Sequence, residues 1–179
     1  MDQCGPRVRL RPMRPDDLES IVRWTTDPEI RELLEGEYPE GPTEGRLWYQ
    51  KTQSDRRTRQ FIIEAEDGIA IGDIALGEIS WRAREAELRI RIGEKAYWNQ
   101  GYGTEAVQEL VRYAFEDLGL NRVYLRVFTF NRRAIRCYVK SGFRAEGRLV
   151  RKGADGTPKE ILLMTVTRDH PAPRWARTS

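Results

Sequence analysis

The spacing of apolar residues changes across a short glycine-rich loop, residues 98–104. It is every second residue before the loop and about every 3.6 residues after it. Before the loop, Ala86–Ile92 alternates apolar and polar side chains, as a strand with one buried face does. After the loop, Thr104–Leu118 repeats apolar residues at three- and four-residue spacing, which predicts an amphipathic helix. A strand followed directly by a long helix, together with antiparallel strands before it, indicates a mixed α/β sheet rather than a doubly wound one.

The same signals place the other elements along the chain. Strands are expected at residues 7–12, Phe61–Ile63, Ile69–Trp81, Val123–Phe128, Arg144–Lys152 and Glu160–Thr167, with turns at Asp67-Gly68 and Asp155-Gly156. Helices are expected at Pro15–Trp24, Glu29–Leu34, Arg46–Gln53 and Asn131–Ser141, with a loop over residues 36–45. This order predicts a mixed sheet whose pairing direction changes in the middle. No composition break divides the chain, so we expect one domain over residues 1–168 and a flexible tail over 169–179.

Composition narrows the chemistry that the chain can perform. The 179 residues include one histidine, His170, and two cysteines, Cys4 and Cys137. Ser–His–Asp, Cys–His and multi-histidine metal sites would all depend on that one histidine, so we expect no metal and a site built from carboxylates, tyrosine, backbone amides or a bound cofactor. The net charge is +3, from 31 basic and 28 acidic residues, and this near balance argues against nucleic-acid binding. No apolar run could span a membrane and no signal-peptide core is present, so a cytoplasmic protein without membrane contacts is expected.

The loop Trp98–Thr104 is the sharpest motif. Gly101 and Gly103 permit a tight turn, and the helix that follows begins with unpaired N–H groups and about half a positive charge. This combination predicts a phosphate site. The loop is neither a Rossmann fingerprint, since Ala106 stands in place of a third glycine, nor a P-loop, which would need Gly-Lys-Ser/Thr. A plain glycine-rich turn is the alternative interpretation.

A second motif covers Asn131–Phe143. Asn131 is suited to cap the predicted helix, and Tyr138 lies almost two turns further on, on the same face. A phenol on an otherwise apolar face either serves chemistry or packs inward with its hydroxyl on a backbone carbonyl.

The two motifs together resemble the signatures of the GNAT superfamily of acetyl-CoA-dependent N-acyltransferases, and most closely its branch of ribosomal-protein alanine acetyltransferases. Ala96–Ala106 is similar to the pyrophosphate loop, and the second signature is matched by Asn131–Ile135, Tyr138, Lys140, Gly142-Phe143 and Glu146-Gly147. The resemblance covers roughly residues 7–167. It departs at Trp98, where the superfamily usually has Arg or Gln, and at Asn99, where the branch commonly has glycine. Asn99 must then keep φ negative or use the left-handed region that asparagine tolerates.

The resemblance implies a mostly antiparallel GNAT-like sheet with a splayed central strand pair, and acetyl-CoA as acyl donor. The pantetheine arm would lie between residues 88–92 and 123–128. The cofactor-binding residues that the resemblance implies are Ile90, Ile92, Trp98, Asn99, Gln100, Gly101, Tyr102, Gly103, Thr104, Asn131, Arg133 and Tyr138. Arg133 would meet the adenosine 3′-phosphate, whereas Arg132 and Arg136 are expected on a solvated face.

The resemblance also implies transfer by direct attack of a neutral amine on the thioester. A backbone N–H within residues 88–92 would stabilise the oxyanion, and Tyr138, with a phenol pKa of about 10, would protonate the departing thiolate. A covalent route through Cys137 is disfavoured because the thiol has no histidine partner. Glu87 is the candidate base, although it could instead pair with Arg89 and Arg91. Glu160 and Glu78 are held in reserve.

The acceptor is left open between a small amine and a protein N-terminus. Acidic residues hint at a cationic amine, namely Glu35, Glu37, Glu40 and Glu44. Trp24, Trp48 and Trp81 either line an acceptor pocket or belong to the core. A non-catalytic acyl-CoA sensor is the alternative function, and a homodimer is compatible with the sequence.

Overall fold

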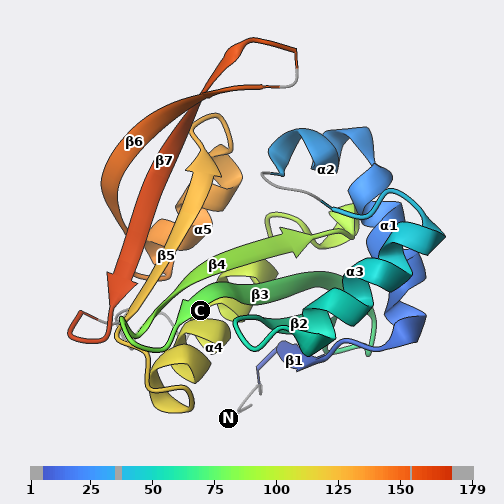
Figure 1. Cartoon of the computed structure of the whole chain (residues 1–179), viewed down its shortest axis with the longest axis horizontal. Coiled ribbons are helices and arrows are strands. Elements are labelled where there is room, and N and C mark those ends of the chain that lie inside the picture. Colours follow the sequence, from blue (N-terminus) through green and yellow to red (C-terminus); the bar gives the residue numbers. More distant parts are fainter. Residues whose placement is uncertain (1–5, 35–37, 154, 171–179) are drawn as a thin grey trace.

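A seven-stranded sheet organises the chain in a computed structural model, which describes residues 6–34, 38–153 and 155–170. The strands are β1 (Val8–Pro12), β2 (Arg59–Ala65), β3 (Ala70–Ser80), β4 (Glu85–Ile92), β5 (Arg122–Phe128), β6 (Arg144–Lys152) and β7 (Pro158–Thr167). The helices are α1 (Leu18–Thr26), α2 (Pro28–Leu33), α3 (Pro42–Ser54), α4 (Tyr102–Glu116) and α5 (Arg132–Lys140), with 3₁₀ turns at Pro15–Asp17 and Lys95–Tyr97. The strand order is β1-β2-β3-β4-β5-β7-β6 (Figure 1).

The centre of the sheet is a pair of strands that separate from each other. All strand pairs are antiparallel except β4 and β5, which are parallel. The β4–β5 pairing comprises three residue pairs and ends at Glu87↔Tyr124, after which the strands diverge (Figure 1). The predicted mixed α/β fold with a splayed central pair is therefore confirmed.

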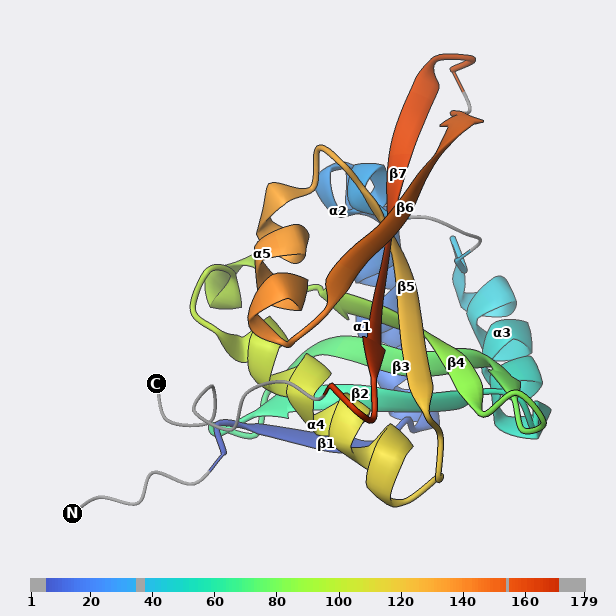
Figure 2. The same ribbon diagram turned by 90° about the vertical axis from the view of Figure 1, so that its left-hand side faces the viewer.

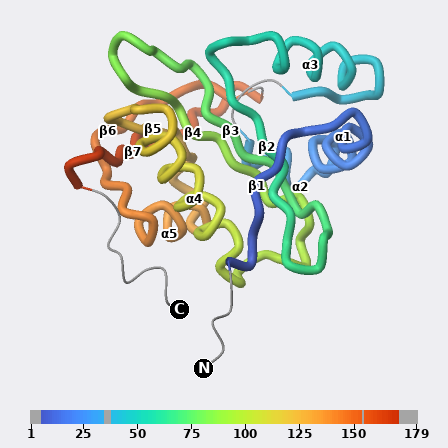
Figure 3. Tube along the Cα trace, turned by 90° about the horizontal axis from the view of Figure 1, so that it is seen from below, coloured from blue at the N-terminus to red at the C-terminus, as the bar shows by residue number. Residues whose placement is uncertain are grey.

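Each face of the sheet carries its own apolar cluster. The alternation of strand side chains puts Ile62 in a cluster with Ile21 and Trp24 of α1, and puts Ile63 in the larger cluster that contains α4. Figures 2 and 3 show α4 and α5 on one face, with α1 and α3 on the other. Two layers of helices thus cover the sheet and bury both faces of its central strands.

The third helix differs from the sequence-based expectation. The prediction places a loop over residues 36–45, of which 36 and 37 lie outside the described residues, but α3 begins at Pro42. Proline is favoured in a first helical turn because its missing N–H would be unpaired there anyway. Gly45 lets α3 approach α1, since a Cβ there would lie 3.4 Å from Val22 Cγ2.

The tryptophans divide between core and surface. Trp24 is buried and Trp48 packs against it in the second cluster, whereas Trp81 is 45% exposed under the guanidinium of Arg59. None of the three lines the cavity described below. Within the described residues, no helix is long and apolar enough to cross a membrane.

Candidate active site

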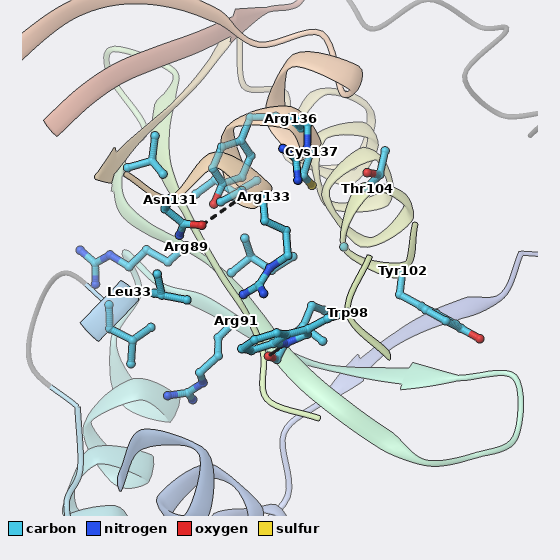
Figure 4. Close-up of a pocket in the computed structure, with 18 of the residues that line it drawn as sticks. Leu33, Arg89, Arg91, Trp98, Tyr102, Thr104, Asn131, Arg133, Arg136 and Cys137 are labelled. Carbon is cyan, nitrogen blue, oxygen red and sulfur yellow. Dashed lines mark hydrogen bonds between the residues drawn. The ribbon is translucent and has the colours of Figure 1, made fainter. Parts of the chain in front are cut away.

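A cavity of about 430 Å³ lies where β4 and β5 part. Its wall comes from the strand β4, the start of α4, the inner face of α5 and the end of α2 (Figure 4). Segments far apart in sequence therefore converge here, and they include both motifs found in the sequence.

The glycine loop has the conformation that an anion site needs. Gly101 adopts φ +87° and caps α4 without a side chain, so the N–H groups of the first turn keep no capping partner. The first helical bond runs from the N–H of Glu105 to the carbonyl of Gly101, at 3.1 Å. Asn99 uses the left-handed region, at φ +59°. Gly103 lies within the helix and leaves space beside Cys137 and Ile92. Free N–H groups at a bare helix start suit a phosphate.

The side chains of Tyr102 and Gln100 bond to neighbouring segments of the protein rather than to the cavity. Tyr102 points away from the cavity (Figure 4), and its hydroxyl donates to Glu66 at 3.0 Å. Arg7 lies over the Tyr102 ring and pairs with Glu105 at 2.7 Å. The amide of Gln100 donates to the carbonyl of Ala96, and Gln100 does not line the cavity.

Trp98 and Arg133 join the two motifs. The Trp98 indole donates to the carbonyl of Ile92 at 2.7 Å, and the Arg133 guanidinium lies over the Trp98 ring (Figure 4). Burial lowers the pKa of Arg133, and it forms no ion pair with any described carboxylate. A partly buried cation without a counter-ion beside a bare helix N-terminus favours an anionic ligand. Arg132 is exposed and away from the cavity, as expected, whereas Arg136 is exposed but lies at its rim.

The open edge of β4 offers backbone groups to a ligand. The N–H of Gly93 donates to Ile71 of β3, so alternation turns the N–H and C=O of Ile90 and Ile92 toward the gap. The Ile92 carbonyl is taken by Trp98, which leaves Ile90 as the main unpaired position. An extended amide-containing chain could add here as a further strand.

The helix α5 brings a phenol to the cavity. Asn131 caps α5 as predicted, accepting from the N–H of Ala134 at 3.2 Å. Tyr138 is 6% exposed, lines the cavity, and its hydroxyl has no hydrogen-bond partner among the described residues. Burial raises the pKa of the phenol well above its usual value, so the group stays protonated. Burial also raises the pKa of the neighbouring Cys137 thiol, which disfavours a thiolate nucleophile.

The polar face of β4 is rich in guanidinium groups. Glu87 is 5% exposed and accepts hydrogen bonds from Arg126, at 3.0 and 3.3 Å, and from Arg89, at 3.3 Å. The expected pairing with Arg89 is therefore present, whereas Arg91 pairs with Asp73 instead. Sequence reasoning missed Arg126 and Tyr38, which also line the cavity. The expected neighbouring positions of β4 and β5 could have identified Arg126 as a residue near the site. No local sequence pattern identifies Tyr38 in the same way.

The remaining acidic candidates lie elsewhere. Glu160 pairs with Arg148 and Glu78 with Arg57, and neither lines the cavity. Glu40 pairs with Arg31, while Glu35 and Glu37 lie outside the described residues. Among the residues that the structure describes, no group of histidine, cysteine or carboxylate side chains could hold a metal ion.

A bare helix start, an open strand edge and a buried phenol along one cavity define a class of enzyme. They fit an acyltransferase whose donor combines a phosphate-bearing end with an extended amide arm and a thioester. A family model described as an acetyltransferase (GNAT) domain matches residues 7–144, and the chain belongs to this family. It transfers acetyl from acetyl-CoA to an amine, and this catalytic assignment is favoured over a sensing role.

Individual relatives agree with this assignment. The chain is 33% identical to the spermidine N(1)-acetyltransferase of Escherichia coli (strain K12) over 143 residues, 80% of this chain and 76% of that protein. It is 29% identical to that of Vibrio cholerae over 144 residues, 80% and 83% of the two chains. The crystal structure of the Vibrio cholerae enzyme in complex with CoA and spermine superposes with a TM-score of 0.85 at 26% identity, covering 93% and 98% of the chains. These comparisons support the family, and not the narrower branch of ribosomal-protein alanine acetyltransferases.

Proposed function

We propose that this enzyme acetylates the primary amine of a small molecule by direct transfer, with Tyr138 as the general acid. The observation that carries the proposal is the position of Tyr138, whose side chain lines the cavity and whose hydroxyl has no hydrogen-bond partner among the described residues. The hydroxyl is therefore available to donate a hydrogen bond to a substrate bound in the cavity.

The donor would be held by three groups of residues. The N–H groups of residues 102–104, with Asn99 and Gly101 shaping the turn, would bind the pyrophosphate. Arg133 would bind the 3′-phosphate, with Asn131 fixing the start of its helix. The backbone of Ile90 would pair with the pantetheine arm. When bound, acetyl-CoA supplies the acetyl group as an activated thioester.

Two groups would stabilise the reaction. Backbone N–H groups of β4 beyond Glu87, where pairing with β5 stops, are fixed donors for a developing oxyanion. Tyr138 would deliver its proton from Oη to the leaving sulfur. Its raised pKa keeps it protonated before transfer, and no described carboxylate competes for its hydrogen bond.

Glu87 would take the proton from the incoming amine. It is the sole carboxylate among the described residues that line the cavity, and it lies at the point where β4 and β5 separate. Its hydrogen bonds from Arg126 and Arg89 fix the orientation of the carboxylate. The expected signature of the Glu87→Gln variant is a loss of kcat that is greatest at low pH, where the amine is mostly charged.

A small acceptor is supported by the relatives. Those named above are spermidine N(1)-acetyltransferases, and spermidine is a small amine. The end of α2 and Tyr38 contribute to the wall of the cavity. Of the two acceptors that the sequence leaves open, a small amine and a protein N-terminus, we therefore propose the small amine. A cytoplasmic location and a homodimer stay predictions.

A thiol-release assay with product identification by mass spectrometry tests the proposal. The purified enzyme, acetyl-CoA and a panel of small primary amines should release CoA together with the acetylated amine, and Tyr138→Phe should lower kcat about 100-fold or more. Peptides with free N-termini form the second arm. Acetylation of peptides but not of small amines, or unchanged turnover in Tyr138→Phe, would contradict the proposal.

A further inference from the structure

Glu105 places a carboxylate in the first turn of α4, the turn whose N–H groups are proposed to bind the pyrophosphate. The N–H groups and the dipole of a helix N-terminus attract any anion, including a carboxylate of the same turn. A free Glu105 would therefore compete with the donor for these groups, and its charge would repel the phosphates. Tight binding of a pyrophosphate requires this carboxylate to be neutralised or held aside.

Arg7, the residue before β1, takes up both oxygens of that carboxylate. The guanidinium Nη2 lies 2.7 Å from Glu105 Oε1, and Nε donates to the same oxygen at 2.8 Å. The backbone N–H of Arg7 donates to Oε2 at 3.2 Å. The two side chains are 31% and 26% exposed, so water screens the pair only in part. Neither residue lines the cavity, so the pair lies outside the space for the donor.

The guanidinium of Arg7 also lies against the turn that precedes α4. It is 4.6 Å from the centre of the Tyr102 ring, and a Cβ added at Gly101 would come within 2.8 Å of its Nη2. The Tyr102 ring is fixed in turn by its hydrogen bond to Glu66 at 3.0 Å and by an edge-on contact with Tyr97 at 5.2 Å. A positive charge is thus fixed beside the N-cap of α4, on the outer side of the loop.

We infer that Arg7 is a positioning residue for the donor, which holds Glu105 away from the first-turn N–H groups of α4 and so leaves them free for the pyrophosphate. The inference rests on the proposed binding of the pyrophosphate by residues 102–104. It gives a role in donor binding to a residue that does not line the cavity, and this role depends on charge as well as on the shape of the loop.

Removal of the cation should weaken only donors that carry a pyrophosphate. Arg7→Met keeps an unbranched side chain over Tyr102 but frees the carboxylate of Glu105. The KM for acetyl-CoA, and the dissociation constant of CoA measured by calorimetry, should both rise about fivefold, while kcat stays within about twofold of the wild type. The kcat/KM for S-acetylpantetheine, which has no phosphate, should be unchanged. A loss of folded protein alone would affect both donors alike.

Removal of the carboxylate should reverse the effect. When Glu105→Gln is added to Arg7→Met, both constants should return to within about twofold of the wild type, because no charge is left to compete. Arg9→Met is the matched control, since Arg9 lies on β1, pairs with Glu64 at 2.6 Å and is 68% exposed, and it should leave both constants unchanged. If Arg7→Met does not fold, Arg7→Gln, which replaces the cation by a neutral amide, takes its place with the same expectations.

Three results would overturn the inference: unchanged CoA binding in Arg7→Met, an equal loss with S-acetylpantetheine, or no recovery on adding Glu105→Gln. The proposed donor site would remain supported in each case if the wild type prefers acetyl-CoA to S-acetylpantetheine. A wild type without that preference would contradict the pyrophosphate site itself, and the inference with it.

Discussion

The guanidinium carbon of Arg133 lies 3.4 Å from the centre of the Trp98 ring, so the two motifs of the sequence are joined by one stacked contact. Trp98 is itself held by the Ile92 carbonyl at the end of β4. A guanidinium that stacks on an aromatic face keeps its N–H edge available for phosphate. The contact therefore positions the cation that we propose for the 3′-phosphate of the donor.

Removal of this cation should weaken binding of the donor. We expect Arg133→Ala to raise the KM for acetyl-CoA about tenfold, because a charge-assisted contact with phosphate is lost. The variant should also lose the preference of the wild type for acetyl-CoA over acetyl-3′-dephospho-CoA, measured as the ratio of the two kcat/KM values. Arg132→Ala, next in sequence but exposed, is the matched control and should keep both values. A preference that survives in Arg133→Ala would show that another group binds the 3′-phosphate.

A substitution at Gly101 can be compared with the same substitution at Gly68, which lies in the turn between β2 and β3. Gly101 and Gly68 both have positive φ, at +87° and +82°. Alanine at either position should cost about 1 to 2 kcal/mol of stability, because the left-handed region is strained for it. Only Gly101→Ala should also raise the KM for acetyl-CoA, since only Gly101 precedes the helix start. Chemical denaturation and steady-state kinetics of both variants measure this, and equal KM values would contradict the role of the loop.

The dependence of kcat on pH should reflect the raised pKa of the Tyr138 phenol. Sequence reasoning assigns Tyr138 an ordinary pKa of about 10, but burial raises it. A raised pKa means that the phenol keeps its proton as the pH increases, so kcat should not decline between pH 8 and about 10 through loss of this proton. Steady-state kinetics across that range check the prediction. A decline with an apparent pKa near 10 that disappears in Tyr138→Phe would contradict it.

A second pH dependence concerns stability. Burial of Asp17 opposes its charge, but hydrogen bonds from Arg11, at 2.8 and 2.7 Å, and from the N–H of Arg14 outweigh this, so its pKa lies below the usual value. The lowered pKa stabilises the fold above the unfolded value of about 3.9, and this stabilisation is lost as the pH falls through the folded value.

Asp17→Asn should therefore be less stable than the wild type by about 1 to 2 kcal/mol at pH 7, because charge-assisted hydrogen bonds from Arg11 are lost while Arg11 keeps Glu64 as a partner. The difference should shrink as the pH falls below about 4. Urea denaturation at several pH values measures it, with the exposed Asp16→Asn as the control. A difference that is independent of pH would rule out the ion pair as its cause.

Sequence patterns predicted the elements near the site better than the contacts within it. Alternation and capping residues are local, so β4, α4 and the Asn131 cap could be predicted from short windows. The predicted start of α3 was wrong because a segment rich in glycine and proline is typical of a loop. Pro42 is nevertheless well placed in the first turn of a helix.

Contacts that depend on register could not be predicted in the same way. The polar face of β4 was evident from alternation, but the partners of its residues come from other strands. Arg126 reaches Glu87 across the parallel β4–β5 pair, and Asp73 meets Arg91 through the antiparallel pairing of β3 with β4. The sequence therefore indicated which residues lie near the cavity, and the fold determined which charges remain without a partner.

A crystal structure of the enzyme with bound CoA tests the central claim most directly. We predict that the pyrophosphate accepts hydrogen bonds from N–H groups of residues 102–104, and that the pantetheine arm lies along Ile90 with its sulfur directed toward Tyr138 Oη. Coenzyme bound away from the start of α4, or with its sulfur remote from Tyr138, would contradict the account.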